Sequence, residues 1–153
     1  MRKWALAKLL RSRRSALPLT PTRSPSDDSP AVKPMSTDLF RLTEEGPVKV
    51  VELILPTSID SSEFDRLNES VLDVMGKEPS AGWVLDLSRV TYMGSAVLGL
   101  MVNIRQVVMK GHGKVVLCGM SDRLMRIFET CCMERLFKIV PGKPEAIRHA
   151  SKR

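Results

Sequence analysis

Aromatic residues are scarce in this chain of 153 residues: four Phe, two Trp and one Tyr make up 5% of it. A hydrophobic core therefore has to be built mainly from aliphatic side chains and the nine Met residues, within a hydrophobic fraction of 43%. The length suffices for one ordinary domain with a single core. The composition thus favours a small α/β domain.

Histidines and cysteines are also few, which limits the chemistry available to the chain. His112 and His149 stand without Cys or carboxylates at metal-ligand spacing, so neither a metal site nor a cofactor is predicted. No nucleophile, base and orienting group can be assembled from the sequence, so no catalytic residue is predicted and an enzyme is disfavoured. Cys131 and Cys132 leave one enzymatic alternative, a reactive thiol, but Cys131 continues an apolar helical stripe and is expected to pack.

With Cys118 the cysteines number three, and a disulfide between the adjacent Cys131 and Cys132 would be strained. We therefore expect reduced thiols and a cytoplasmic location. No apolar run approaches the roughly 20 residues that span a bilayer, so no transmembrane segment is predicted.

Positive charge is concentrated at the start of the chain. Residues 1–34 contain eight of the 24 basic residues and two of the 17 acidic ones, a net charge of +6, which leaves +1 for the rest. Because the remainder is nearly neutral, a groove for a phosphate backbone and direct nucleic acid binding are not predicted. Residues 15–34 are rich in Pro, Ser and Thr with few large apolar side chains, which predicts disorder.

Residues 1–14 combine Trp4 and several leucines with basic residues and no acidic one. Three interpretations stay open: a mitochondrial-type transit peptide, an amphipathic segment that contacts a membrane surface peripherally, or an incidental extension upstream of a true start at Met35. We divide the chain into a basic extension, residues 1–34, and a folded domain, residues 35–153.

From Met35 onward the pattern alternates between strands and helices. Strands are expected at residues 39–42, 48–55, 83–87, 114–118 and 136–140, and helices at 60–76, 95–109, 121–133 and 144–150. Asp60 followed by Glu63 forms a capping-box signature. The helix at 95–109 is long enough for a right-handed crossover between parallel strands. The predicted fold is α/β, a mixed or parallel sheet of four to five strands with helices packed on it.

Ser95 lies where a strand and a loop give way to a helix. In that position its hydroxyl is able to cap backbone N–H groups, which is worth about 1 kcal/mol. A phosphate on it would meet the positive end of the helix dipole. A structural cap and a modifiable contact site are therefore both open interpretations.

One stripe of polar or small residues follows the expected helix at helical spacing: Ser95, Gly99, Asn103, Gln106 and Lys110. The other faces are apolar, so this stripe is expected to be exposed with Ser95 at its head. Gly99 lacks a Cβ and would let a partner approach closely. Phosphorylation of Ser95 would add a charge of about −1.5 to −2 to the surface and could abolish an interface there.

This segment resembles the bacterial anti-sigma factor antagonists, which are STAS domains. Their signature is a strand, a loop ending in Phe/Tyr-Met/Ile-Asp-Ser-Ser-Gly-Leu-Gly, and a helix. The matching positions are Tyr92, Met93, Ser95, Leu98 and Gly99. The sequence departs from the signature at Gly94 in place of Asp, Ala96 in place of a second Ser or Thr, and Val97 in place of Gly.

Downstream, residues 113–119 are similar to the family's next strand, and residues 133–140 to its closing Gly-Leu-Asp-Arg-Leu-Phe element. The likeness covers about 100 residues from Leu39 onward. Carried over by position, the family's phosphoacceptor serine is Ser95. Gly94, which precedes it, also permits a positive φ at this turn.

The resemblance implies a protein-binding switch that binds an anti-sigma factor, typically a serine kinase, and so regulates sigma-factor-dependent transcription. Phosphate on Ser95 would block this binding and a phosphatase would restore it. The residues expected to contact the partner are Gly94, Ser95, Ala96, Gly99, Asn103, Gln106 and Asp60. The alternative is a STAS regulatory subunit of a membrane transporter complex, which would bind its ATPase without phosphorylation.

Overall fold

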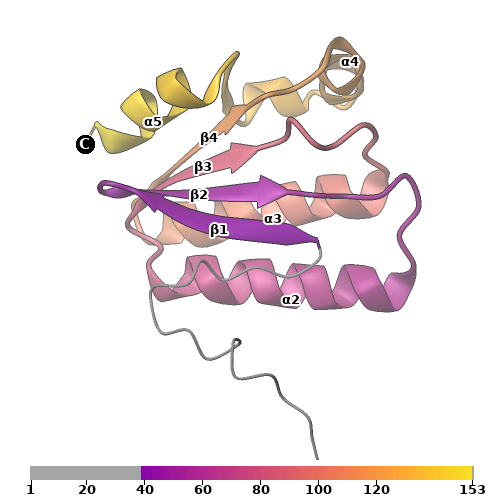
Figure 1. Cartoon of the computed structure of the whole chain (residues 1–153), viewed down its shortest axis with the longest axis horizontal. Coiled ribbons are helices and arrows are strands. Elements are labelled where there is room, and N and C mark those ends of the chain that lie inside the picture. The colour runs from indigo at the N-terminus through magenta and orange to yellow at the C-terminus, as the bar shows by residue number, and fades with distance from the viewer. Residues whose placement is uncertain (1–38, 153) are drawn as a thin grey trace, which may run out of the picture. The chain divides into compact units, whose positions relative to one another are not determined.

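The computed structural model describes residues 39–152, and Figure 1 shows their arrangement. The predictions for residues 1–34 and for Met35 as the first folded residue fall outside this range. The structure opens with a hairpin of β1 (Phe40–Glu45) and β2 (Val48–Leu53). The two strands pair antiparallel around Gly46, whose φ of 64° suits glycine in a tight turn.

The rest of the chain alternates helices with parallel strands. After α2 (Ser61–Lys77) come β3 (Gly82–Asp86), α3 (Ser95–Lys110) and β4 (Lys114–Cys118). They are followed by α4 (Asp122–Thr130), the 3-10 helix η3 (Met133–Arg135), β5 (Lys138–Val140) and α5 (Lys143–Ser151). The strands form one sheet in the order β1-β2-β3-β4-β5, in which β2 to β5 run parallel. The predicted mixed sheet of four to five strands is confirmed.

The two faces of the sheet carry separate hydrophobic clusters, because successive side chains of a strand point to opposite faces. On one face Leu53, Leu85 and Leu117 pack beneath α2 and α3. On the other face Val84 and Val116 pack against α5. Figure 1 shows α2 and α3 together on one side of the sheet and α5 on the other. The sheet is therefore a central layer between helices.

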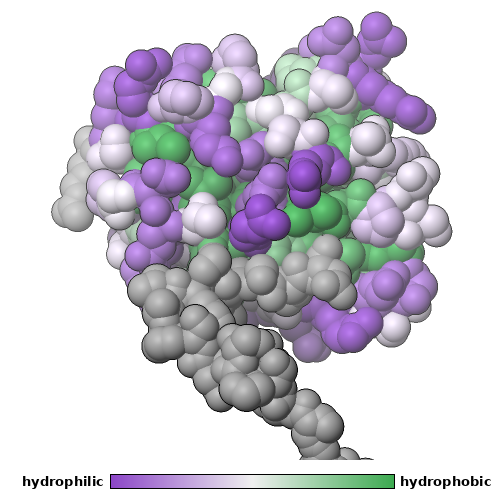
Figure 2. Space-filling model, viewed as in Figure 1, coloured by the Kyte–Doolittle hydropathy of each residue, from purple (hydrophilic) through white to green (hydrophobic). Residues whose placement is uncertain are grey.

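The edge strand β1 carries charge where it meets solvent. Arg41 pairs with Glu52 at 3.4 Å and Glu44 with Lys49 at 3.0 Å, while Phe40 points into the core. Figure 2 shows hydrophilic residues interspersed with apolar ones on this side of the molecule. Charged side chains on an edge strand oppose its pairing with a strand of another molecule.

Several predicted boundaries are wrong. The first strand runs to Glu45 rather than to residue 42, because the hairpin pairs it along all of β2. The helix predicted at 121–133 ends at Thr130, since Cys132 adopts a left-handed φ of 56° that breaks it. Cys131 is consequently exposed, which corrects its predicted packing. The last strand begins at Lys138 instead of residue 136.

None of the helices within residues 39–152 has the length and apolar character needed to cross a membrane.

Candidate functional site

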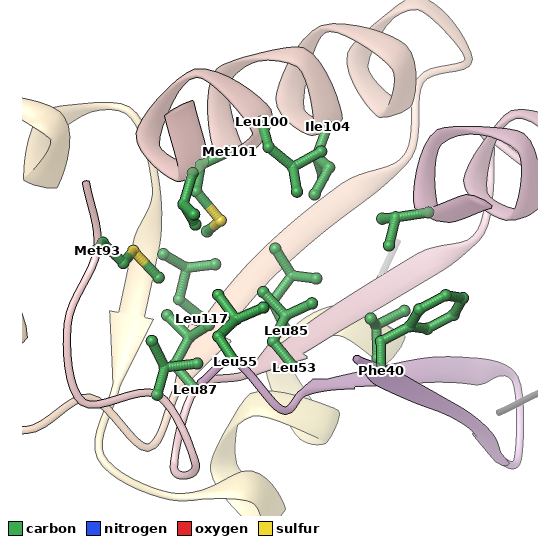
Figure 3. Close-up of a cluster of buried hydrophobic side chains, with 14 of the residues drawn as sticks. Phe40, Leu53, Leu55, Leu85, Leu87, Met93, Leu100, Met101, Ile104 and Leu117 are labelled. Atoms are coloured by element: carbon green, nitrogen blue, oxygen red, sulfur yellow. The ribbon is translucent and has the colours of Figure 1, made fainter. Parts of the chain in front are cut away.

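The loop before α3, residues 87–94, is held to the core by three of its side chains. Leu87, Val90 and Met93 are 0%, 3% and 1% exposed, whereas Tyr92 is 45% exposed. Figure 3 shows Met93 pointing from this loop into the core that Met101 and Leu117 also enter. Burial of the residues on either side therefore presents Tyr92 to solvent and sets the position at which α3 begins.

Gly94 is the N-cap residue of α3 and Ser95 is the first residue of the helix. The predicted capping role of Ser95 is therefore wrong: the carbonyl of Gly94 accepts the N–H of Leu98 at 3.1 Å, and no side chain caps the helix. The expected use of a positive φ at Gly94 is also wrong. Its φ and ψ are −88° and −179°, an extended conformation open to other residues.

Ser95 is exposed, and its hydroxyl makes no hydrogen bond with any residue in the 39–152 range. The first turn of α3 contains no acidic residue, so the partial positive charge of this helix terminus has no carboxylate in that turn. A phosphoryl group on the Ser95 oxygen would be placed at the end of the helix that favours an anion. Attaching it would break no hydrogen bond between Ser95 and another residue of the 39–152 range.

The predicted stripe on α3 is exposed along its whole length, which confirms the helical projection. Ser95, Gly99, Asn103, Gln106 and Lys110 all face solvent. The opposite side of the helix is buried through Val97, Leu100, Met101, Ile104 and Val108. Among the described residues, no atom outside the helix lies within 4 Å of the place where a Cβ on Gly99 would stand. The surface is therefore open to a partner at this point.

A surface hollow of about 340 Å³ lies next to Ser95. It is formed by the segment that follows β2 and by the start of α3: Leu55, Pro56, Thr57, Ser58, Ile59, Tyr92, Gly94, Ser95, Ala96 and Val97. The guanidinium of Arg123 from α4 lies 5.8 Å from the centroid of the Tyr92 ring, within cation–π range. Two segments distant in sequence thus meet beside Ser95, and α4 contacts one of them at Tyr92.

Asp60 caps α2. Its carboxylate accepts the N–H of Glu63 at 2.8 Å and the hydroxyl of Ser62 at 2.9 Å, and the Glu63 side chain accepts the N–H of Asp60, which confirms the capping box. These bonds, the backbone N–H of Glu63 first, hold the pKa of Asp60 below its ordinary value. Asp60 is exposed but does not line the hollow, which reaches its neighbour Ile59.

Sequence reasoning missed the buried carboxylate of Asp86 at the end of β3. It is 5% exposed, accepts the N–H of Ser88 at 3.0 Å and pairs with Lys143 of α5 at 3.1 Å. Burial by itself raises the pKa of Asp86, but the bonds from Ser88 and Lys143 outweigh it and lower the pKa. The only signal in the sequence was an acidic residue within an apolar strand run.

The nearby Cys118 thiol is buried, and desolvation together with the charge of Asp86 raises its pKa to about 11. A thiol of that pKa is largely protonated at neutral pH and a weak nucleophile. Within residues 39–152 no group of three His, Cys, Asp or Glu side chains could hold a metal ion.

Several known proteins resemble this chain in sequence or in fold. An anti-sigma-B factor antagonist of Listeria monocytogenes is 28% identical over 89 residues, which cover 58% of this chain and 77% of that protein. A STAS domain protein of Planctomyces limnophilus, described as an anti-sigma-factor antagonist, has a solved structure with a TM-score of 0.64 at 21% identity. The match covers 74% of this chain and 98% of that one.

The phosphorylated form of the Bacillus cell fate determinant SpoIIAA also has this fold, with a TM-score of 0.54 at 15% identity and coverage of 72% and 97%. At these identities the structural likeness shows the shared fold. A family model described as the STAS domain matches residues 41–146, from β1 into α5. The chain therefore belongs to the STAS domain family and has anti-sigma factor antagonists among its relatives.

Proposed function

We propose that this protein is an anti-sigma factor antagonist that binds an anti-sigma factor of the serine-kinase type and is switched by phosphorylation of Ser95. The observation that carries the proposal is the exposed Ser95 hydroxyl at the N-terminus of α3, which makes no hydrogen bond with the described part of the chain. It heads an open surface stripe and borders a hollow. The names of the relatives support it, since one is an anti-sigma-B factor antagonist and another has been solved in a phosphorylated form.

The partner would contact α3 from Ser95 to Gln106 and the segments beside its first turn. Gly94, Ser95 and Ala96 border the hollow, and Gly99, Asn103 and Gln106 continue the exposed stripe. Asp60 would contribute from the start of α2. The small residues at the head of the stripe leave room for a close approach, so a bulky charged group on Ser95 would disrupt the fit directly.

The switch would act on the surface without refolding the domain. A phosphoryl group adds a charge of about −1.5 to −2 and three acceptor oxygens. The N-terminus of α3 would stabilise this charge within the domain, while a partner that docks here would have to desolvate it. Binding would be lost and the fold kept, and a phosphatase would restore binding.

In this role the protein would catalyse no reaction and need no cofactor or metal, and it would act in the cytoplasm on sigma-factor-dependent transcription. Direct binding to nucleic acid is not part of the proposal.

The test is to isolate the protein from its native cells, identify its partner, and locate phosphate by mass spectrometry. Ser95→Ala should retain the partner and Ser95→Asp should lose it. Ser80→Asp, at another exposed serine, is the matched control and should behave like the wild type. If Ser95→Ala and Ser95→Asp hold the same partner with equal affinity, the switch is wrong.

The same experiment distinguishes the alternative, a regulatory subunit of a membrane transporter complex. Gly94, where anti-sigma factor antagonists usually have Asp, and the basic residues 1–34 are the features that favour it. Recovery of a transporter ATPase, bound equally by both Ser95 variants, would establish that role instead.

A further inference from the structure

A second depression lies at the β5 edge of the sheet. Its volume is about 300 Å³, and we call it the β5-edge groove. Its lining comes from the second half of α3, from β4, from the turn into β5 and from α5: Arg105, Met109, Lys114, Val115, Val116, Leu136, Phe137, Lys138 and His149. Tertiary packing alone brings these four segments together.

The lining of the groove is positively charged. Arg105, Lys114 and Lys138 line it, and no acidic residue of the described part does. None of the three forms an ion pair with a carboxylate in residues 39–152. Six other Lys and Arg residues in that range do: Arg41, Lys49, Lys77, Arg89, Arg135 and Lys143. Arg105, Lys114 and Lys138 are therefore without a paired carboxylate among the described residues, while the carboxylate of Glu145 lies 3.8 Å from the Nε2 of His149 at the groove.

Two of these cations are nonetheless held in place. The Nε of Arg105 donates to the carbonyl of Leu136 at 2.8 Å, and the Nζ of Lys114 donates to the carbonyl of Lys152. The backbone carbonyl oxygens that accept these bonds are uncharged, so they position the Arg105 and Lys114 side chains without neutralising their positive charge. The bond from Arg105 also ties α3 to the turn before β5, so the groove exists before any partner binds.

The groove also exposes apolar surface. Met109 is 52% and Leu136 38% exposed, and they are two of the three large hydrophobic residues exposed in the described chain. Single exposed apolar residues need no explanation, but two that line one concave site together with Val115 and Phe137 mark a binding surface.

We propose that the β5-edge groove binds a segment of a partner protein that carries apolar side chains interspersed with carboxylates. The apolar residues would cover Met109 and Leu136, and the carboxylates would pair with Arg105, Lys114 and Lys138. Nucleic acid supplies the negative charge but no aliphatic side chains. The chain's own residues 1–34 have a net charge of +6 and are the wrong sign for this site.

This inference is independent of the proposed switch. Arg105 and Met109 follow Ser95 by ten and fourteen residues on α3, which corresponds to about 15 and 21 Å along the helix axis. A charge on Ser95 is more than a Debye length of about 8 Å away from the groove and is largely screened at physiological salt. Docking here is expected to be insensitive to the state of Ser95.

The test is an NMR titration of the full chain, labelled with ¹⁵N, with a short synthetic peptide of alternating Leu and Glu. Amide shifts should concentrate at the residues that line the groove. A control peptide in which Lys replaces every Glu should produce no such shifts. Binding of the Leu–Glu peptide should weaken as salt is raised, because ion pairs at the rim are screened.

Two substitutions locate the site and two serve as controls. Lys138→Glu reverses a rim charge and Met109→Ser removes an exposed apolar anchor, so each should weaken binding by about tenfold without unfolding the domain. Arg66→Glu, at an exposed cation on α2, and Ser95→Asp should leave the affinity within about twofold.

Four results would overturn the inference: no shifts with the Leu–Glu peptide, shifts that map elsewhere, equal binding of the Lys peptide, or groove variants with unchanged affinity. Binding to phosphatidylcholine vesicles that contain phosphatidylglycerol, lost in Lys138→Glu when the peptide does not bind, would assign the groove to membranes instead. Self-association abolished by the same variant would assign it to a second copy of the chain.

Discussion

Replacing Ser95 with aspartate should raise the stability of the domain even though it is expected to abolish partner binding. Ser95 is the first residue of α3, its hydroxyl makes no bond in the described structure, and the first helical turn lacks an acidic residue. The substitution therefore removes no hydrogen bond made within the described residues, and it adds a negative charge at the positive end of the helix. Such a charge contributes about 0.3–1 kcal/mol when exposed.

The reverse substitution, Ser95→Lys, should cost a similar amount, so the two variants should differ by about 0.6–2 kcal/mol. For a domain of this size 1 kcal/mol shifts the Tm by about 3–5 °C, so the Tm of the two variants should differ by about 2–10 °C. Ser95→Asn, which is polar and uncharged, should fall between them. Calorimetry at low salt measures the three values.

Salt provides the decisive control, because a terminal charge effect is screened. At about 1 M salt the Debye length falls to about 3 Å and the difference between the Asp and Lys variants should shrink. Equal Tm values at low salt, or a difference that salt leaves unchanged, would refute the role assigned to the helix terminus. A stable Ser95→Asp that fails to bind would show that its binding defect is not unfolding.

Three further substitutions test other parts of the structure. Gly94→Asp should raise the unfolding free energy by a few tenths of a kcal/mol, about the gain of a side-chain N-cap over glycine, and a marked loss in urea denaturation would contradict the open geometry found there. Gly99→Ala should raise the unfolding free energy by about 0.5–1 kcal/mol, because glycine is costly within a helix, and an unchanged urea midpoint would count against this account. Asp86→Asn should lower it by about 1–3 kcal/mol, less than for a fully buried pair because Lys143 is 43% exposed. The pKa of Asp86 is lowered by folding, so its contribution is complete above the ordinary carboxylate pKa of about 4 and is lost as pH falls further. The unfolding free energies of wild type and Asp86→Asn should therefore differ by a constant amount from neutral pH down to about pH 5 and converge below about pH 4. Curves that stay parallel below that pH would exclude the pairing.

Much of the fold follows from local patterns. The α3 stripe from Ser95 to Lys110 could be read from its spacing because helical neighbours are three and four residues apart. The capping box of Asp60 and Glu63 involves residues three apart, so it could also be predicted from the spacing. The apolar runs that became β3 and β4 were long enough to indicate strands. These features depend on interactions within one element.

Element ends were less predictable because tertiary contacts set them. The loop before α3 is fixed by the burial of Val90 and Met93, and this makes Gly94 rather than Ser95 the N-cap. The helical spacing predicts that Cys131 belongs to the apolar stripe of α4. The chain instead turns at Cys132, which has a left-handed φ, and Cys131 is exposed. A periodic pattern shows that a helix exists and does not show where packing ends it.

The sequence by itself determined the α/β alternation, the exposed face of α3 and the resemblance to STAS domains, since each is encoded in short-range spacing or a contiguous motif. The tertiary structure decided the rest. It pairs Asp86 with Lys143, 57 positions later in the chain, brings the segment after β2 beside Ser95, and assembles the β5-edge groove from four segments. Contacts between distant segments depend on how helices and strands pack together, so the type of a residue does not predict which distant residue it will contact.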